Sequence, residues 1–164
     1  MAKFVSDHAS QRLLQAHKSE LDQALESHKS QLSKETETHK LKLKREELIF
    51  QREVEAAQAF MSMWRAVWPR YRMPDMDWDD ACSDAAEDFG LYEKILEDFL
   101  EQHTIAISDT VRQGIESARS IAAREKFFTL EQGQEPPTEA VKAAGEMLDL
   151  LKEAQNHILK DLRR

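Results

Sequence analysis

The feature that most constrains this chain is a block of eleven residues that occurs three times in succession from residue 14 onward. Each block carries a His three residues after its start and a Leu four residues after that His. Eleven residues complete three helical turns at about 3.67 residues per turn, so these positions form one stripe on a nearly straight helix. The stripe consists of Leu14, His17, Leu21, Leu25, His28, Leu32, Thr36, His39 and Leu43.

This stripe is narrow and rich in His, whereas an isolated helix usually depends on burying a broad apolar face against something else. We therefore expect residues 14–43 to lie along a partner. The partner is either a second copy of the chain, which makes a homo-oligomer, or another helical protein. The predicted seam comprises the Leu and His residues of the stripe.

A different spacing begins after residue 43. Apolar residues recur in alternating steps of four and three at Phe50, Val54, Ala57, Met61, Trp64 and Trp68, which is typical of a helix with one buried face. No Gly or Pro occurs before Pro69, so one helix should continue from about residue 8 to residue 67. We assign residues 1–45 to a coiled-coil stalk and residues 46–164 to a helical bundle that should fold alone as a monomer.

Three further helices are expected downstream. The first runs from Trp78 to His103 with Gly90 in its interior, the second begins after Ser108 as its N-cap, and the third spans about 138–162. The predicted fold is all-α, with a long N-terminal coiled-coil helix running into an up-down four-helix bundle. Its predicted core is Phe50, Val54, Trp64, Trp68, Phe89, Leu96, Phe99, Ile115, Leu148, Leu151 and Ile158.

Three segments, KREELIFQREVEAAQAF (44–60), PRYRMPDMDWDDAC (69–82) and the helix start at 106–108, together with the His-Lys repeats, carry a resemblance. They resemble a family of uncharacterised bacterial cytosolic proteins that have a His-Lys-repeat coiled-coil helix followed by a small helical domain. The resemblance covers about three quarters of the chain. It implies a bacterial cytosolic origin and a coiled-coil helix joined to a bundle, and it implies no activity, ligand or cofactor.

Charge and composition narrow the class of function. The net charge is −8, and residues 51–164 hold 14 Lys and Arg against 23 Asp and Glu, which disfavours nucleic acid as the main partner. No apolar run is long enough to span a membrane. The start lacks the apolar region of a signal peptide, and Cys82 is the one cysteine, which fits a reducing cytoplasm. We expect a cytoplasmic protein without a membrane partner.

Two groups of residues suggest alternatives. His17, His28 and His39 from several chains would form layers that bind a metal or sense pH, although we favour the interpretation that they are amphipathic residues at a loosely packed seam. Arg65, Arg70 and Arg72 lie beside Trp64 and Trp68, an arrangement suited to single-stranded nucleic acid. The competing interpretation places these Trp residues in the core, with the Arg side chains paired to the acidic run 75–80.

No Ser or Cys nucleophile elbow, phosphate-binding loop, paired-Cys metal motif or dinucleotide fingerprint is present in the sequence, and the acidic neighbours of Cys82 make its thiol a poor nucleophile. We therefore expect a non-catalytic assembly or scaffold protein without a cofactor. Its N-terminal helix would mediate oligomerisation or partner binding, and its acidic bundle would be a docking surface. The alternatives are a nucleic-acid accessory factor and a metal or pH sensor.

Overall fold

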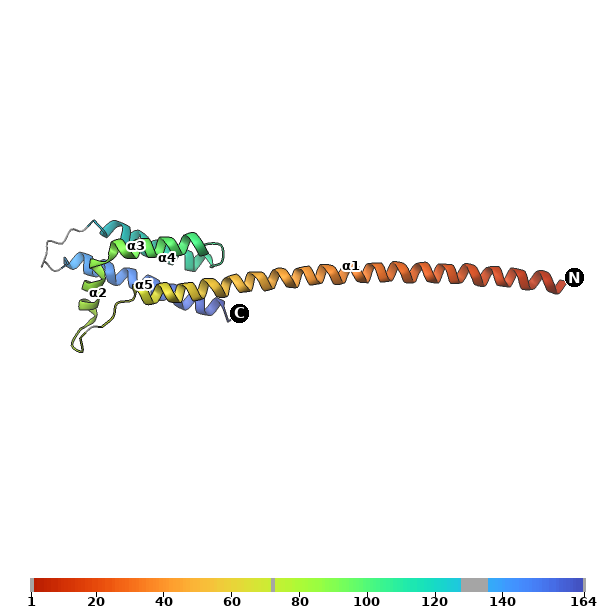
Figure 1. Cartoon of the computed structure of the whole chain (residues 1–164), viewed down its shortest axis with the longest axis horizontal. Coiled ribbons are helices and arrows are strands. Elements are labelled where there is room, and N and C mark those ends of the chain that lie inside the picture. Colours follow the sequence, from red (N-terminus) through yellow and green to blue (C-terminus); the bar gives the residue numbers. More distant parts are fainter. Residues whose placement is uncertain (1, 72, 128–135, 164) are drawn as a thin grey trace. The chain divides into compact units, whose positions relative to one another are not determined.

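The computed structural model describes the backbone of residues 2–71, 73–127 and 136–163, and side chains from residue 14 onward. Within these residues the chain forms five helices and no strand, which confirms the all-α class (Figure 1). By contact the chain divides into two units, Met1–Leu48 (unit 1) and Ile49–Arg164 (unit 2). The helices are α1 (Ala2–Val67), α2 (Trp78–Glu87), α3 (Phe89–His103), α4 (Asp109–Glu125) and α5 (Thr138–Asp161).

Helix α1 begins at Ala2, earlier than the residue 8 expected, and ends at Val67, as predicted. Several of its hydroxyl side chains donate to carbonyls of the preceding turn, which keeps them compatible with the helix. Thr36 Oγ1 bonds the carbonyl of Leu32 at 2.7 Å, and Thr38 Oγ1 bonds that of Lys34 at 2.8 Å. Pro69 then stops the helix, because a prolyl ring clashes with the preceding turn and offers no N–H.

The prediction of one continuous helix over residues 78–103 was wrong. The chain breaks at Asp88, whose φ of −104° and ψ of 14° are not helical, and this residue separates α2 from α3. Gly90 follows two residues later and lowers the helical preference of this stretch. The break has a packing reason: α2 contacts α5, whereas α3 contacts α4. Among its described residues, unit 2 therefore contains one helix more than the predicted four-helix bundle.

The N-terminus of α2 lies where the acidic run predicted it, and a capping box holds it. The Asp77 carboxylate accepts from the backbone N–H of Asp80 at 2.9 Å, and the Asp80 carboxylate accepts from the N–H of Asp77 at 3.1 Å. Two N–H groups that lack helical partners are thereby satisfied. Acidic residues of this run cap the N-terminus of α2 and lie in its first turn, where the helix dipole favours negative charge.

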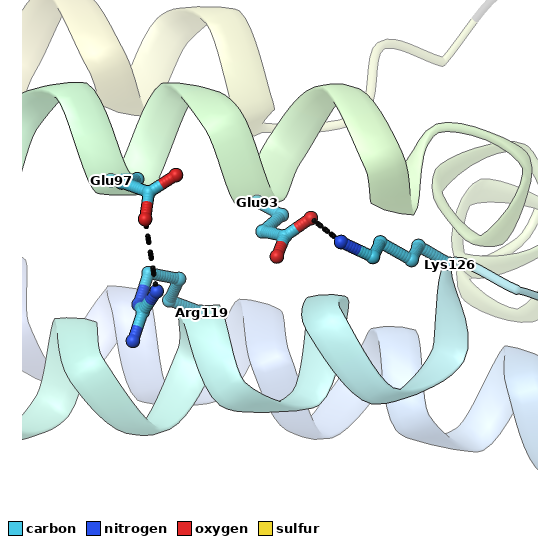
Figure 2. A network of polar contacts seen from close by, with 4 residues as sticks. All are labelled: Glu93, Glu97, Arg119 and Lys126. Carbon is cyan, nitrogen blue, oxygen red and sulfur yellow. Dashed lines mark hydrogen bonds and ion pairs between the residues drawn. The ribbon is translucent and has the colours of Figure 1, made fainter.

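Helices α3, α4 and α5 run in alternating directions, and α4 contacts both of the others (Figure 1). Two ion pairs join α3 to α4 and to Lys126, the residue that caps the end of α4: Lys126 Nζ lies 2.6 Å from Glu93 Oε2, and Arg119 Nη1 lies 3.3 Å from Glu97 Oε1 (Figure 2). Ser108 precedes α4 in the N-cap position, as predicted, but its hydroxyl makes no capping bond. It donates instead to Asp161 Oδ2 at 2.8 Å and joins the start of α4 to the end of α5.

The core of unit 2 confirms seven predicted residues and corrects four. Phe89, Leu96, Phe99, Ile115, Leu148, Leu151 and Ile158 are buried, whereas Phe50 is 55% exposed. Val54, Trp64 and Trp68 are only partly buried. The buried face of α1 instead carries Ala56, Ala57, Phe60, Met63 and Val67.

The reason for this correction lies in two parallel apolar series on α1. Phe60, Met63 and Val67 have the same spacing as the predicted series but stand one residue earlier. A shift of one residue turns the buried face by about 100°. The Phe60 ring meets the Phe99 ring edge to face, with centroids 5.7 Å apart, and this contact selects the earlier series as the core face.

Candidate functional site

The predicted seam lies on α1 within unit 1, and all of its residues are exposed. The five leucines of the seam are between 51% and 69% exposed. No described side chain of the chain covers them. Exposed apolar side chains that follow one another along a single face are typical of a surface that binds another protein. The seam residues are Leu14, His17, Leu21, Leu25, His28, Leu32, His39 and Leu43.

The three His residues of the seam are separated from one another within a chain. Neighbouring His residues are eleven positions apart, which corresponds to about 16 Å along a helix. Within the described residues no three His, Cys, Asp or Glu side chains lie close enough to hold a metal ion. A shared metal at His17, His28 or His39 would therefore require ligands from further chains. His17 Nδ1 lies 3.4 Å from Glu20 Oε2 on the same helix.

Charged residues border the seam on both sides at the same eleven-residue spacing. Lys18, Lys29 and Lys40 form one border, which we call the basic flank. Glu35 and Glu46 form the other, which we call the acidic flank, with Ala24 at the equivalent position of the first block. At 3.67 residues per turn, each flank lies about 65° from the centre of the stripe. The seam thus has opposite charges along its two edges.

The two flanks differ in their contacts within the chain. On the acidic flank, Glu35 Oε1 accepts from Gln31 Nε2 at 3.1 Å, and Glu46 Oε1 lies 3.9 Å from Lys42 Nζ. Among the side chains from residue 14 onward that the structure describes, none forms an ion pair with the Lys residues of the basic flank. The local pairs are exposed and add little stability, so both flanks remain available to a partner.

The candidate nucleic-acid residues are only partly brought together. Arg65 and Arg70 are exposed, and Arg72 lies outside the described residues. Trp64 and Trp68 stack on each other with centroids 4.2 Å apart, and Trp68 also contacts Trp78. These ring contacts occupy faces that stacked bases would need. Among the described residues, neither Arg65 nor Arg70 forms an ion pair with an acidic residue of the run 75–80. The predicted Arg–Asp pairing is therefore wrong for these two residues.

A hollow of about 690 Å³ between α2 and α5 was not predicted from the sequence. Trp78 lines it together with four carboxylates, Asp79, Asp80, Glu146 and Asp149, and one cation, Lys142. The two helices are far apart in the chain, so no local pattern signals this grouping. A second hollow of about 400 Å³ is mainly apolar and is lined by Phe50, Ile105, Ala106, Ile107, Ile158 and Leu162, with Glu53, Ser108 and Asp161 as its polar members.

Cys82 lies at the wall of the larger hollow but is only 2% exposed. Burial, with a further contribution from the negative charges of Asp79 and Asp149, raises the pKa of its thiol from 9.0 to about 11. A thiol in this state holds its proton at neutral pH and does not supply a thiolate. The geometry therefore agrees with the expected poor nucleophilicity of Cys82.

Comparison of the chain with protein-family models, with curated proteins and with solved structures finds no match. Among the helices that the structure describes, none has an apolar stretch long enough to cross a lipid bilayer. Within the described residues, the seam on α1 and the acidic hollow of unit 2 are the surfaces that bear on function.

Proposed function

We propose that this protein is a non-catalytic assembly or scaffold protein whose helix α1 binds another helix through the seam. The observation that carries the proposal is the row of exposed leucines repeated every eleven residues. Covering these leucines removes apolar surface from water, at about 25 cal/mol for each Å². A second helix provides a straight apolar stripe of matching length, and a small ligand does not.

Unit 2 would provide the docking surface of the assembly. Its residues carry a large excess of Asp and Glu, and four carboxylates gather with Trp78 around one hollow. A surface of this charge favours partners with basic residues and disfavours nucleic acid. The proposal places the protein in the cytoplasm, where a single buried thiol remains reduced.

The nucleic-acid alternative has weaker support, because the indole rings beside Arg65 and Arg70 are engaged with one another. A gel-shift assay with single-stranded DNA and RNA at two salt concentrations tests it. Binding at micromolar protein that weakens with salt would favour this alternative. We expect no shift at either concentration.

The test of the assembly function compares two variants that introduce Glu on the same helix. Leu21→Glu combined with Leu32→Glu places two carboxylates in the seam. Leu41→Glu is the matched control, since Leu41 is 70% exposed and lies nine residues from Leu32, on the opposite face of α1. We expect the seam variant to lose partner binding, and the control to keep it, while circular dichroism shows equal helix content.

Two measurements report partner binding. Light scattering gives the mass of the purified chain, and affinity capture from a cell extract of the source organism identifies other helical partners. A parent protein that is monomeric and captures nothing that depends on Leu21 and Leu32 would refute the proposed function. Loss of binding in the Leu41→Glu control would show that the seam has no special role.

A further inference from the structure

We infer that the seam of α1 binds a second copy of this chain, with the two helices parallel and in register. The inference rests on the proposed function, because it names the occupant of the same surface. Its evidence is the distribution of charge along the two flanks, which the assembly proposal does not use.

In a two-stranded pair of helices, the residues that border the apolar seam meet those of the partner, and their charges set the orientation. In a parallel pair, each flank faces the opposite flank of the other chain. In an antiparallel pair, each flank faces its own equivalent. A helix with one basic and one acidic flank is therefore complementary to itself only in the parallel orientation.

In the parallel pair, lysines of the basic flank lie near glutamates of the acidic flank of the second copy. In the parallel, in-register pair, Lys29 approaches Glu35 of the second copy and Lys40 approaches Glu46, six residues further along in each case. The symmetry of the pair repeats each contact on the other side. Because Glu35 and Glu46 have only exposed local partners in the single chain, they can exchange these partners for the lysines at little cost.

In the antiparallel pair with full overlap, residues of equal charge face each other across the interface. Leu14 then packs against Leu43 of the second copy and Leu25 against Leu32, so the apolar stripe is still covered. However, Lys18 now faces Lys40, and the two copies of Lys29 face each other. Like charges across a helical interface are destabilising. Apolar burial alone does not choose between the two orientations, whereas the charged flanks favour the parallel one.

The parallel order also gives the repeated His a consistent position. Each of His17, His28 and His39 lies at the height of its own copy, so the pair contains three layers of two imidazoles. In the antiparallel order with full overlap, His17 lies one residue, about 1.5 Å, from the height of His39 of the other chain. The His residues therefore form layers in either orientation, and the charged flanks alone favour the parallel one.

Disulfide trapping tests the orientation in the full chain. Cys82 is replaced by Ala, and a single Cys is introduced by Leu14→Cys, by Leu43→Cys or, as a control on the opposite face, by Leu41→Cys. A disulfide forms only when the two Cα atoms approach within about 7 Å. Residues 14 and 43 are about 43 Å apart along a helix, so the two orientations give different products after mild oxidation.

The expected result is a cross-linked dimer of the Leu14→Cys chain and of the Leu43→Cys chain, each on its own, and none for Leu41→Cys. A cross-link that appears only when the first two chains are mixed would show an antiparallel pair and overturn the inference, while the proposed function would stand. A monomeric mass for the parent would overturn the inference too. The seam would then need a different helical protein, and the capture experiment decides whether the proposed function survives.

A charge reversal gives an independent measurement. The variant Lys18→Glu, Lys29→Glu, Lys40→Glu places acids against Glu35 and Glu46 in a parallel pair, so we expect the dissociation constant to rise about tenfold at low salt. In an antiparallel pair the same variant exchanges one like-charge row for another, and the dissociation constant stays unchanged. An unchanged constant would therefore overturn the parallel orientation.

Discussion

Replacing Phe60 by Ala tests which face of α1 builds the core of unit 2. Phe60 is 0% exposed, and its ring meets the Phe99 ring edge to face at 5.7 Å and 78°. Truncating a buried Phe costs about 3–5 kcal/mol from lost burial and the cavity left behind. The edge-to-face pair accounts for about 0.5–1.5 kcal/mol of that loss. A domain with an ordinary stability of about 5–15 kcal/mol is therefore severely weakened.

The matched control is Phe50→Ala, which removes the same side chain from the same helix. Phe50 belongs to the series that the sequence indicates as core, yet it is 55% exposed. Its replacement should cost less than about 1 kcal/mol. The contrast between the two variants therefore isolates the choice of face from the general effect of removing a phenyl ring.

Urea unfolding followed by tryptophan fluorescence is the assay, since all three Trp residues lie in unit 2. With a slope of about 2 kcal/mol per molar urea, Phe60→Ala should lower the midpoint by about 2 M, and Phe50→Ala by less than about 0.5 M. Measurements at two protein concentrations separate folding from assembly. Equal losses for both variants, or a larger loss for Phe50→Ala, would refute the assignment of the buried face.

Three further changes have expected outcomes. Asp77→Ala removes the capping box with Asp80, so unit 2 should lose about 1 kcal/mol in urea unfolding; an unchanged midpoint would mean that the cap adds nothing. Gly90→Ala meets no neighbouring atom within 4 Å and should raise thermal stability by about 0.5–1 kcal/mol, whereas a lower melting temperature would indicate a strained backbone at the start of α3. In the folded chain the Cys82 thiol has a pKa of about 11 and retains its proton between pH 9 and 11, whereas the unfolded chain loses this proton. The free energy of unfolding should therefore fall by about 1.4 kcal/mol per pH unit over this range. Cys82→Ala should lack this part of the slope, and identical slopes for both proteins would contradict the burial of the thiol.

Local features of the sequence determined the helical class and most helix ends. Pro69 stops α1, the acidic run starts α2, Ser108 precedes α4, and α5 covers nearly the predicted residues. These features act within one or two turns of backbone, through ring clashes, capping and the helix dipole. The position of the stripe on α1 also follows from the sequence, because an eleven-residue recurrence lies on one side of a helix whatever surrounds it, while its role as a seam stays a prediction.

Only the tertiary structure decided which of two adjacent apolar series on α1 is buried. Phe60, Met63 and Val67 have the same spacing as the series that ends in Trp64 and Trp68. Periodicity cannot distinguish two series that differ by one residue. The contact between Phe60 and Phe99 distinguishes them, and it joins helices that are far apart in the chain.

The break at Asp88 and the acidic hollow have the same kind of origin. The spacing of apolar residues over 78–103 is compatible with one helix, but α2 contacts α5 while α3 contacts α4. The grouping of Asp79 and Asp80 with Glu146 and Asp149 depends on that contact between α2 and α5. A sequence pattern reports which residues share a face of one helix, whereas the neighbour of that face is selected by how side chains from distant segments fill space together.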